Sequence, residues 1–224
     1  EQIYGESPYK SPTDMGVNMA GNCICDDEAC REASKQEIIR RYFDALNALA
    51  KGSTSDKEAQ KIELLMNMAG ITAADRKVAV KALERAKETN GPAAALELHD
   101  GRIITGKTTN LLGASAALLL NVLKVLAGID HEVHIISPES IEPIQKLKVD
   151  YLKSKNPRLH TDEVLIALSA SAATNPQARL ALSQLPELAG CQAHTSVMLS
   201  DVDIKIFKKL DVQLTSEAVY EHTL

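Results

Sequence analysis

The chain has 224 residues, a net charge of −5 at pH 7, 45% hydrophobic residues and 3% aromatic residues, with no tryptophan. An acidic chain of this kind lacks the basic surface that nucleic-acid binding requires, so we expect no nucleic-acid partner. The hydrophobic fraction is sufficient for a core of Ala, Leu, Ile and Val. No apolar run is long enough to span a bilayer, so we expect no membrane partner.

Residues 1–26 predict an extended leading segment. Gly5, Pro8 and Pro12 interrupt regular structure, and an apolar run at 16–24 could form a short strand. The chain does not open with Met. We therefore expect this segment to be the remnant of a longer N-terminal part, and the missing N-terminal half to be a partner of this chain.

Three of the four cysteines lie close together in the sequence. Cys23, Cys25 and Cys30 follow a C-x-C-x4-C pattern, which lacks the paired C-x2-C spacing of structural zinc sites. We expect no metal site. Four cysteines in a chain of this length do not form a disulfide framework, and no signal peptide is visible, which favours a reducing, cytoplasmic setting.

Residues 27–91 predict a small helical subdomain. Apolar residues recur on one face of 27–50 with charges opposite, which predicts an amphipathic helix. A second helix begins near Ser55 and ends at Gly70, a C-cap glycine. Thr72 caps a third helix that reaches Glu88. The charged runs on these helices are interpreted as solvated faces.

Residues 92–224 predict an α/β sandwich subdomain. Asp100-Gly101 is a two-residue hairpin signal between apolar residues, which predicts a hairpin over 94–106. A helix over 113–127 is apolar on nearly every side, so we expect it to be buried against a sheet and to end at Gly128.

Strands and helices alternate through the rest of this subdomain. Further strands are predicted at 133–136, 193–199 and 212–215. Further helices are predicted at 138–153, at 161–173 with Thr161 as cap, at 177–185, and at 203–209 with Asp201 or Asp203 as cap. This alternation predicts a three-layer αβα sandwich, preceded by the small helical subdomain.

The stretch Gly101–Thr108 fits the letter pattern of a phosphate-binding P-loop. Ile103, Ile104 and Thr105 occupy its variable positions, and β-branched residues are stiff and favour an extended backbone. No acidic strand is found that could hold magnesium. We interpret 102–105 as a strand and expect no cofactor in this chain, with a nucleotide possible only in the full-length protein.

The loop between this strand and the next helix supplies the candidate site. Helix N-termini leave free N–H groups that suit an anion, and α/β sheets bind ligands outside the carboxyl ends of their strands. We therefore predict a site for a small anionic metabolite. Its candidate residues are Lys107, Thr108, Thr109, Asn110, Ser115, Arg158 and His160.

Each candidate residue also has a structural interpretation. Thr109, Asn110 and Ser115 could only cap the helix while Lys107 is solvated. The guanidinium of Arg158 suits a carboxylate or phosphate, or it could pair with Asp162 or Glu163. His160 could be a general base, or it could cap a helix or make a plain loop contact. His194, at a strand start, is interpreted as structural. Asp14, Asn18, Lys35 and Arg40 form a second polar set, which could contact the missing half.

The order of hairpin, buried helix, strand and helix resembles the cytidine-deaminase-like fold. Zinc deaminases carry His or Cys, then x-Glu, on the first helix and Pro-Cys-x-x-Cys on the next. Here the matching positions are Ser115-Ala116-Ala117-Leu118 and Glu142-Pro143-Ile144-Gln145-Lys146-Leu147. No zinc ligands and no catalytic Glu are present, so the resemblance implies the fold without the deaminase chemistry.

Long specific stretches resemble an uncharacterised bacterial family, domain of unknown function 1846, also called uncharacterised protein family 0371. The matching stretches are Ser11–Met19, Glu32–Tyr42 and Ser154–His160, and the likeness covers essentially the whole chain. The resemblance implies that this chain is the C-terminal half of members about twice as long, whose N-terminal half carries its own P-loop-like segment. Some members are labelled ATP-dependent peptidases, but this chain shows no peptidase constellation.

Two hypotheses about function follow. In the first, the chain is the binding or catalytic-support half of a cytoplasmic protein that handles a nucleotide or a small anionic metabolite. In the second, it is a scaffold whose helices over 27–90 assemble a homo-oligomer.

Overall fold

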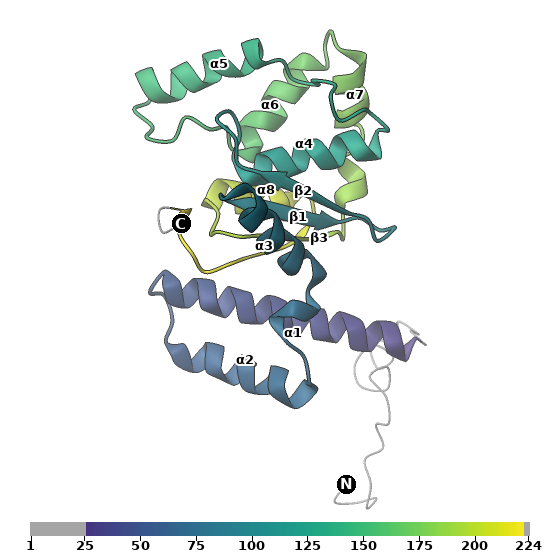
Figure 1. The fold of residues 1–224 in the computed structure, drawn as a ribbon, viewed down its shortest axis with the longest axis vertical. Coiled ribbons are helices and arrows are strands. Elements are labelled where there is room, and N and C mark those ends of the chain that lie inside the picture. Colours follow the sequence, from purple (N-terminus) through teal and green to yellow (C-terminus); the bar gives the residue numbers. More distant parts are fainter. Residues whose placement is uncertain (1–25, 222–224) are drawn as a thin grey trace, which may run out of the picture.

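The computed structural model describes residues 26–221, and Figure 1 shows its fold. The N-terminal helices are α1 (Asp27–Ala50), α2 (Asp56–Ala69), the 3-10 turn η2 (Ala73–Asp75) and α3 (Lys77–Thr89). The elements that follow are β1 (Ala93–Glu97), β2 (Ile103–Lys107), α4 (Ala114–Leu126), α5 (Pro138–Lys146), the π-helical turn η3 (Leu147–Tyr151), α6 (Thr161–Ser171), α7 (Pro176–Leu182), η4 (Leu185–Leu188), β3 (Gln192–Thr195), α8 (Asp201–Lys209) and β4 (Gln213–Ser216).

The four strands form one open sheet in the order β2-β1-β3-β4. β1 is antiparallel to both β2 and β3, and β3 is parallel to β4. The predicted hairpin is confirmed, and Gly101 in its turn has φ 82°, a value that favours glycine. Because β1 runs against its two neighbours, the carboxyl ends of β2, β3 and β4 meet at one edge of the sheet.

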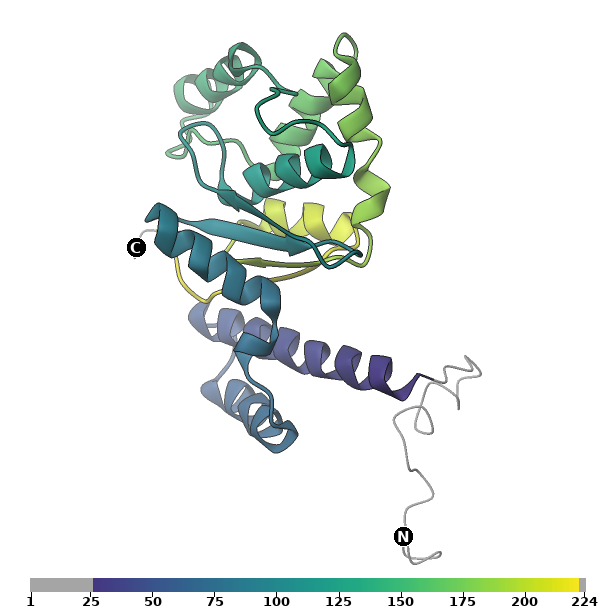
Figure 2. The ribbon, with the colours of Figure 1, turned by 45° about the vertical axis from the view of Figure 1, so that its right-hand side comes forward.

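Helices cover both faces of this sheet (Figures 1 and 2). α3 lies on one face, with α1 beneath it and against β4, while α4 and α8 lie on the other face. The residues of α4 from Ala114 to Leu120 are all buried, which confirms the prediction of a buried helix. The fold is therefore mixed α/β, as the alternation predicted.

Gly106 marks the closest approach of β2 to α4. A Cβ atom at this position would lie 2.2 Å from the backbone N and 2.5 Å from the Cα of Leu118. No side chain fits there, so glycine is required for the strand to cross the helix backbone. Both glycines of the P-loop pattern thus have structural roles, one in the hairpin turn and one in this crossing.

The α1–α2 hairpin has a small core of its own, in which Ile39 and Phe43 meet Met66. Gly70 ends α2 with φ 65°, as predicted. The third helix differs from its prediction, because Thr72 caps the short turn η2 and α3 begins only at Lys77. The proposed boundary at residue 91 stays a prediction, and α3, on its N-terminal side, packs against β1.

The strand predicted at 133–136 is wrong. These residues form a turning loop, and Ile135 and Ile136 are buried in the main core. A short apolar run indicates burial but does not specify the backbone conformation. No described strand lies beside residues 133–136 to form the hydrogen bonds of a sheet with them. The helix predicted over 138–153 is also shorter, since regular α-helix ends at Lys146 and a π-helical turn follows.

The caps of α6 and α8 also differ from the predictions. His160, not Thr161, is the N-cap of α6, and Ser200 is the N-cap of α8, where it accepts a hydrogen bond from the N–H of Asp203. The predicted strand at 16–24 and the residues Cys23 and Cys25 lie outside the described residues. Without a strand at 133–136, the likeness to the cytidine-deaminase-like fold stays a prediction.

Candidate binding sites

The predicted loop after β2 is closed by hydrogen bonds within the protein. Thr109 Oγ1 accepts from the N–H groups of Leu111 and Leu112 at 3.3 and 3.0 Å, and the N–H of Thr108 donates to Pro92 at 2.9 Å. The carbonyl of Asn110 accepts from Gln145 at 3.1 Å. Thr109 therefore shapes the loop and does not cap α4, whose N-cap is Gly113.

The start of α4 is joined to the segment before α6. Gly113 donates its N–H to the carbonyl of Leu159 at 3.2 Å, and Leu159 donates to Leu111 at 2.9 Å. The N–H of Gly113 is thus not free for an anion. Ser115 is buried, with 3% of its surface exposed, and lines none of the pockets described below.

Arg158 forms an ion pair with Glu221 near the end of the described chain, instead of with Asp162 or Glu163. Glu163 accepts from the ammonium of Lys148 at 2.7 Å and from the backbone N–H of His160 at 2.8 Å. The guanidinium of Arg158 is therefore engaged within the protein.

His160 binds a carboxylate on another helix. Its Nδ1 lies 2.9 Å from Asp203 Oδ2, and this hydrogen bond raises the pKa of His160. Burial alone would raise the pKa of Asp203, but hydrogen bonds from His160, Thr161 and Ser200 outweigh burial and hold it at about 2. The pair joins the start of α6 to the start of α8, which matches the capping interpretation of His160.

Two of the predicted residues, Lys107 and Thr109, line one pocket of about 300 Å³. Arg85 of α3 and Lys124 of α4 line the same pocket, which we call the basic pocket. No Asp or Glu lines it. Burial lowers the pKa of Lys124, while Asp130 and Glu132 oppose this effect. The basic pocket can therefore attract an anion through three cationic side chains from α3, β2 and α4.

The basic pocket contains one unsatisfied donor. Arg85 Nε is buried and has no hydrogen-bond partner among the described residues, while Arg85 Nη1 is 3.0 Å from Glu88. Sequence reasoning missed Arg85 and Lys124, because charges on helix faces are usually solvated. Only the packing of α3 and α4 around β2 brings these residues to Lys107.

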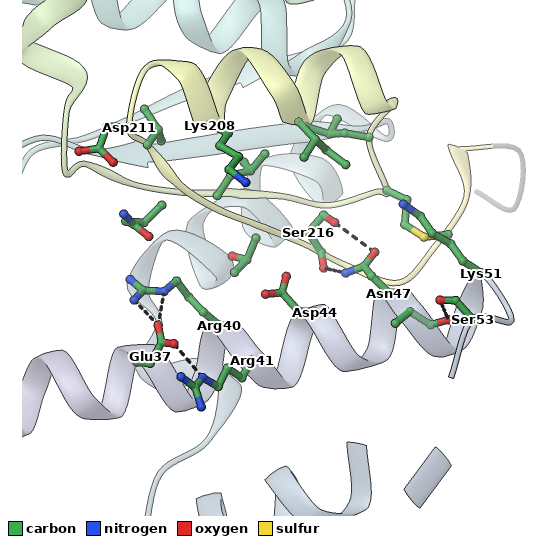
Figure 3. Close-up of a pocket in the computed structure, with 18 residues that line it drawn as sticks. Glu37, Arg40, Arg41, Asp44, Asn47, Lys51, Ser53, Lys208, Asp211 and Ser216 are labelled. Atoms are coloured by element: carbon green, nitrogen blue, oxygen red, sulfur yellow. Dashed lines mark hydrogen bonds and ion pairs between the residues drawn. The ribbon is translucent and has the colours of Figure 1, made fainter. Parts of the chain in front are cut away.

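A larger pocket of about 610 Å³ lies between α1, α8 and β4, and we call it the α1–α8 pocket (Figure 3). Figure 3 shows Arg40, Asp44 and Asn47 on the side of α1 that faces β4, with Lys208 opposite on α8. The spacing of the three α1 residues places them on one helix face. Their helical spacing was the available signal, but the sequence assigned Arg40 to contacts with a missing half.

Several polar groups of the α1–α8 pocket are already paired. Glu37 accepts hydrogen bonds from both Arg40 and Arg41, and the amide of Asn47 bonds the carbonyl of Ser216 at 2.8 Å. Figure 3 marks these contacts as dashed lines. The carboxylate of Asp44 forms no hydrogen bond or ion pair within the described range 26–221, so it is available to a ligand.

Residues 26–221 contain no group of three or more His, Cys, Asp or Glu placed to hold a metal ion. The described helices include none that is both long and apolar enough to cross a bilayer.

These features define a mixed α/β protein with one open sheet and two charged pockets. The residues that resemble a P-loop form the strand β2. Two sequence models of one family match the chain. The model for domain of unknown function DUF1846, C-terminal, matches residues 74–224, and that for its N-terminal domain matches 1–70. The chain belongs to this family. The expectation that it holds only the C-terminal half is wrong, because α1 and α2 match the N-terminal domain.

Several bacterial relatives are designated UPF0371 protein. The relative from Corynebacterium urealyticum is 58% identical over 220 residues, which are 98% of this chain and 44% of the relative. The relative from Corynebacterium aurimucosum is 59% identical over 220 residues, with the same coverage. One from Streptococcus pneumoniae is 51% identical over 222 residues, 99% of this chain and 45% of the relative. The chain thus spans less than half the length of these relatives.

Proposed function

We propose that the protein binds a small anionic metabolite in the basic pocket. The observation that carries this proposal is the charge of the lining, in which Arg85, Lys107 and Lys124 are cationic and no Asp or Glu is present. Cationic groups converge here from three elements, although Arg85 also pairs with Glu88 and Lys124 donates to the carbonyl of His131. Their mutual repulsion is relieved by an anion.

The size of the basic pocket favours a small acid over a nucleotide. A volume of about 300 Å³ is at the lower end of the range for small-molecule sites. Gly106 cannot wrap a phosphate chain, because it is packed against Leu118. The buried Nε of Arg85 would donate to a carboxylate or phosphate oxygen, which are the acceptors that guanidinium groups prefer.

Titration calorimetry with inorganic phosphate and with citrate tests this proposal. Lys107→Ala and Arg85→Ala should each weaken binding about tenfold, the effect of one charge-assisted hydrogen bond. Lys155→Ala is the matched control, because Lys155 is exposed and lies outside the basic pocket. Equal affinities in all three variants, or no binding by either anion, would show that the pocket is a solvated cleft.

A second candidate function, assembly of a homo-oligomer, rests on the surface of α2. Leu64, Leu65 and Met68 are 61%, 52% and 77% exposed, and α2 packs against α1. Exposed apolar side chains grouped on one helix favour a protein contact. Sedimentation of Leu64→Lys/Met68→Lys against Leu180→Lys, an exposed apolar residue on α7, tests this candidate. Only the Leu64→Lys/Met68→Lys variant should dissociate into single chains.

We place these functions in the cytoplasm. The two cysteines in the described part of the chain, Cys30 and Cys191, are free thiols, which supports a reducing compartment. The likeness to deaminases contributes nothing to the proposed chemistry, since its zinc-ligand positions hold Ser115 and Ala117. Secretion of the protein with oxidised cysteines would contradict this placement.

A further inference from the structure

A buried arginine lies directly behind the α1–α8 pocket. Arg76 is 1% exposed, and every hydrogen-bond acceptor of its guanidinium is neutral. These acceptors are Thr215 Oγ1 at 2.8 Å, Gln192 Oε1 at 2.7 Å, Gln36 Oε1 at 3.4 Å, and the carbonyls of Ala193 at 3.0 Å and Gln213 at 2.7 Å. The charge of Arg76 therefore has no carboxylate partner at ion-pair distance within the described chain.

Arg76 keeps its charge at neutral pH. Burial lowers its pKa to about 10, with Arg40 adding to this effect and Glu97 and Asp44 opposing it. A buried charge without a counter-ion is costly, and its field extends into any adjacent cavity of low polarity. Gln213 and Thr215, two of its acceptors, also line the α1–α8 pocket, so this field reaches the pocket.

The rim of the α1–α8 pocket carries unpaired groups of both signs. The ammonium groups of Lys51 and Lys208 and the carboxylates of Asp44 and Asp211 form no hydrogen bond or ion pair with another residue of the range 26–221. Although the carboxylate of Asp44 reaches solvent, burial and the nearby Glu37 raise its pKa, while Arg40 and Arg76 oppose this effect. The carboxylate of Asp44 thus lacks a cation at ion-pair distance within the described residues.

We infer that the α1–α8 pocket binds a small zwitterion, an α-amino acid or a peptide of two to three residues. The ammonium group of this ligand pairs with Asp44, and its carboxylate lies between Lys208 and Lys51, above the field of Arg76. The pocket volume of about 610 Å³ accommodates a ligand of this size.

Ligands with a single charge fit the α1–α8 pocket less well. A pure anion would lie beside Asp44, and a pure cation would lie beside Lys208 and the field of Arg76. Only a ligand with both charges places a partner beside unpaired groups of both signs. This ligand differs from the simple anion proposed for the basic pocket, and the inference is independent of that proposal.

NMR titration of the chain with alanine, dialanine and trialanine tests the inference. Each ligand has two matched controls, an N-acetylated form that lacks the ammonium group and an amide that lacks the carboxylate. The free zwitterion should bind, and each blocked form should bind about tenfold more weakly, since each loses one charge-assisted contact. This comparison needs no protein variant.

Two variants assign the two contacts. Asp44→Asn should weaken binding of the zwitterion about tenfold and leave binding of the N-acetylated form unchanged. Lys208→Met should also weaken binding of the zwitterion about tenfold, and it should leave binding of the amide unchanged. Asp201→Asn and Lys205→Met, exposed on α8 and outside the pocket, are the controls. Equal binding of free and blocked forms, or no binding of any zwitterion, would overturn the inference.

Discussion

Asp203 of α8 accepts a hydrogen bond from the backbone N–H of Thr161, the first residue of α6, at 2.9 Å. The same carboxylate accepts from the hydroxyl of Thr161 at 2.8 Å and from that of Ser200 at 2.7 Å. His160 donates a fourth hydrogen bond, because an ionised carboxylate can only accept. The positive end of α6 is therefore occupied by an anion of the chain itself.

Asp203→Asn should destabilise the protein by about 3 kcal/mol, because the buried site is built for a charged acceptor of four hydrogen bonds. An amide presents one oxygen and two donors, so at least two donors lose their partner. Urea unfolding followed by circular dichroism measures the change. Asp201→Asn, exposed on the same helix, should change the free energy of unfolding little. An equal loss in the two variants would contradict the role of this network.

The His160–Asp203 pair should make stability depend on pH. The pKa of His160 is raised above its ordinary 6.5, so its contribution is complete below pH 6.5 and is lost as pH rises through the raised value. The pKa of Asp203 is lowered from 3.8 to about 2, so its contribution is present above pH 3.8 and is lost as pH falls towards 2. The pair should therefore stabilise the folded protein most between pH 3.8 and pH 6.5.

Urea unfolding of the native protein and of His160→Gln at about pH 5.5 and about pH 8.5 tests this dependence. The difference in the free energy of unfolding between the two proteins should be larger at the lower pH, where His160 is charged. A difference that is the same at both values would show that His160 contributes only a neutral hydrogen bond.

Gly106→Ala should destabilise the protein by about 3 kcal/mol or prevent folding, because the new Cβ would overlap the backbone of Leu118. Gly113→Ala is the matched control. Its Cβ would meet the carbonyl of Leu159 at 3.7 Å, an ordinary contact, and its φ of −69° suits alanine. Thermal unfolding should separate the two variants clearly. A stable Gly106→Ala protein would mean that β2 and α4 can move apart.

Arg76→Met should destabilise the protein by about 3 kcal/mol, since five acceptors from α1, β3 and β4 would lose their shared donor. Arg102→Met, on the exposed hairpin turn, should have little effect. Urea unfolding measures both. Because Arg76 lies at the start of the stretch that matches the C-terminal domain model and donates a hydrogen bond to Gln36 of α1, its loss should also increase amide exchange in α1. Unchanged exchange there would limit the role of Arg76 to the sheet.

The purified chain should not hydrolyse ATP, because the P-loop-like letters form the strand β2 and its glycine is packed against α4. A phosphate-release assay measures turnover. Lys107→Ala should leave the background rate unchanged. Turnover that disappears in this variant would mean that the loop after β2 rearranges around a nucleotide.

The sequence alone determined the elements whose signals are local. Gly70 and Gly101 end or turn the chain where their positive φ is needed, and Asp100-Gly101 specified the hairpin. The apolar run after Gly113 identified a buried helix before any contact was known. Such signals succeed because each depends on the conformation of a few neighbouring residues, which the residue types themselves restrict.

Tertiary structure decided everything that depended on distant partners. The start of α6 is capped by Asp203, 42 residues beyond Thr161, and the apolar residues at 133–136 are buried in a loop without forming a strand. The pocket around Lys107 of β2 also requires Arg85 from α3 and Lys124 from α4. Burial, charge pairing and helix crossing depend on which surfaces of the folded protein meet. A residue pattern indicates that a surface is buried, but it does not indicate which other segment covers that surface.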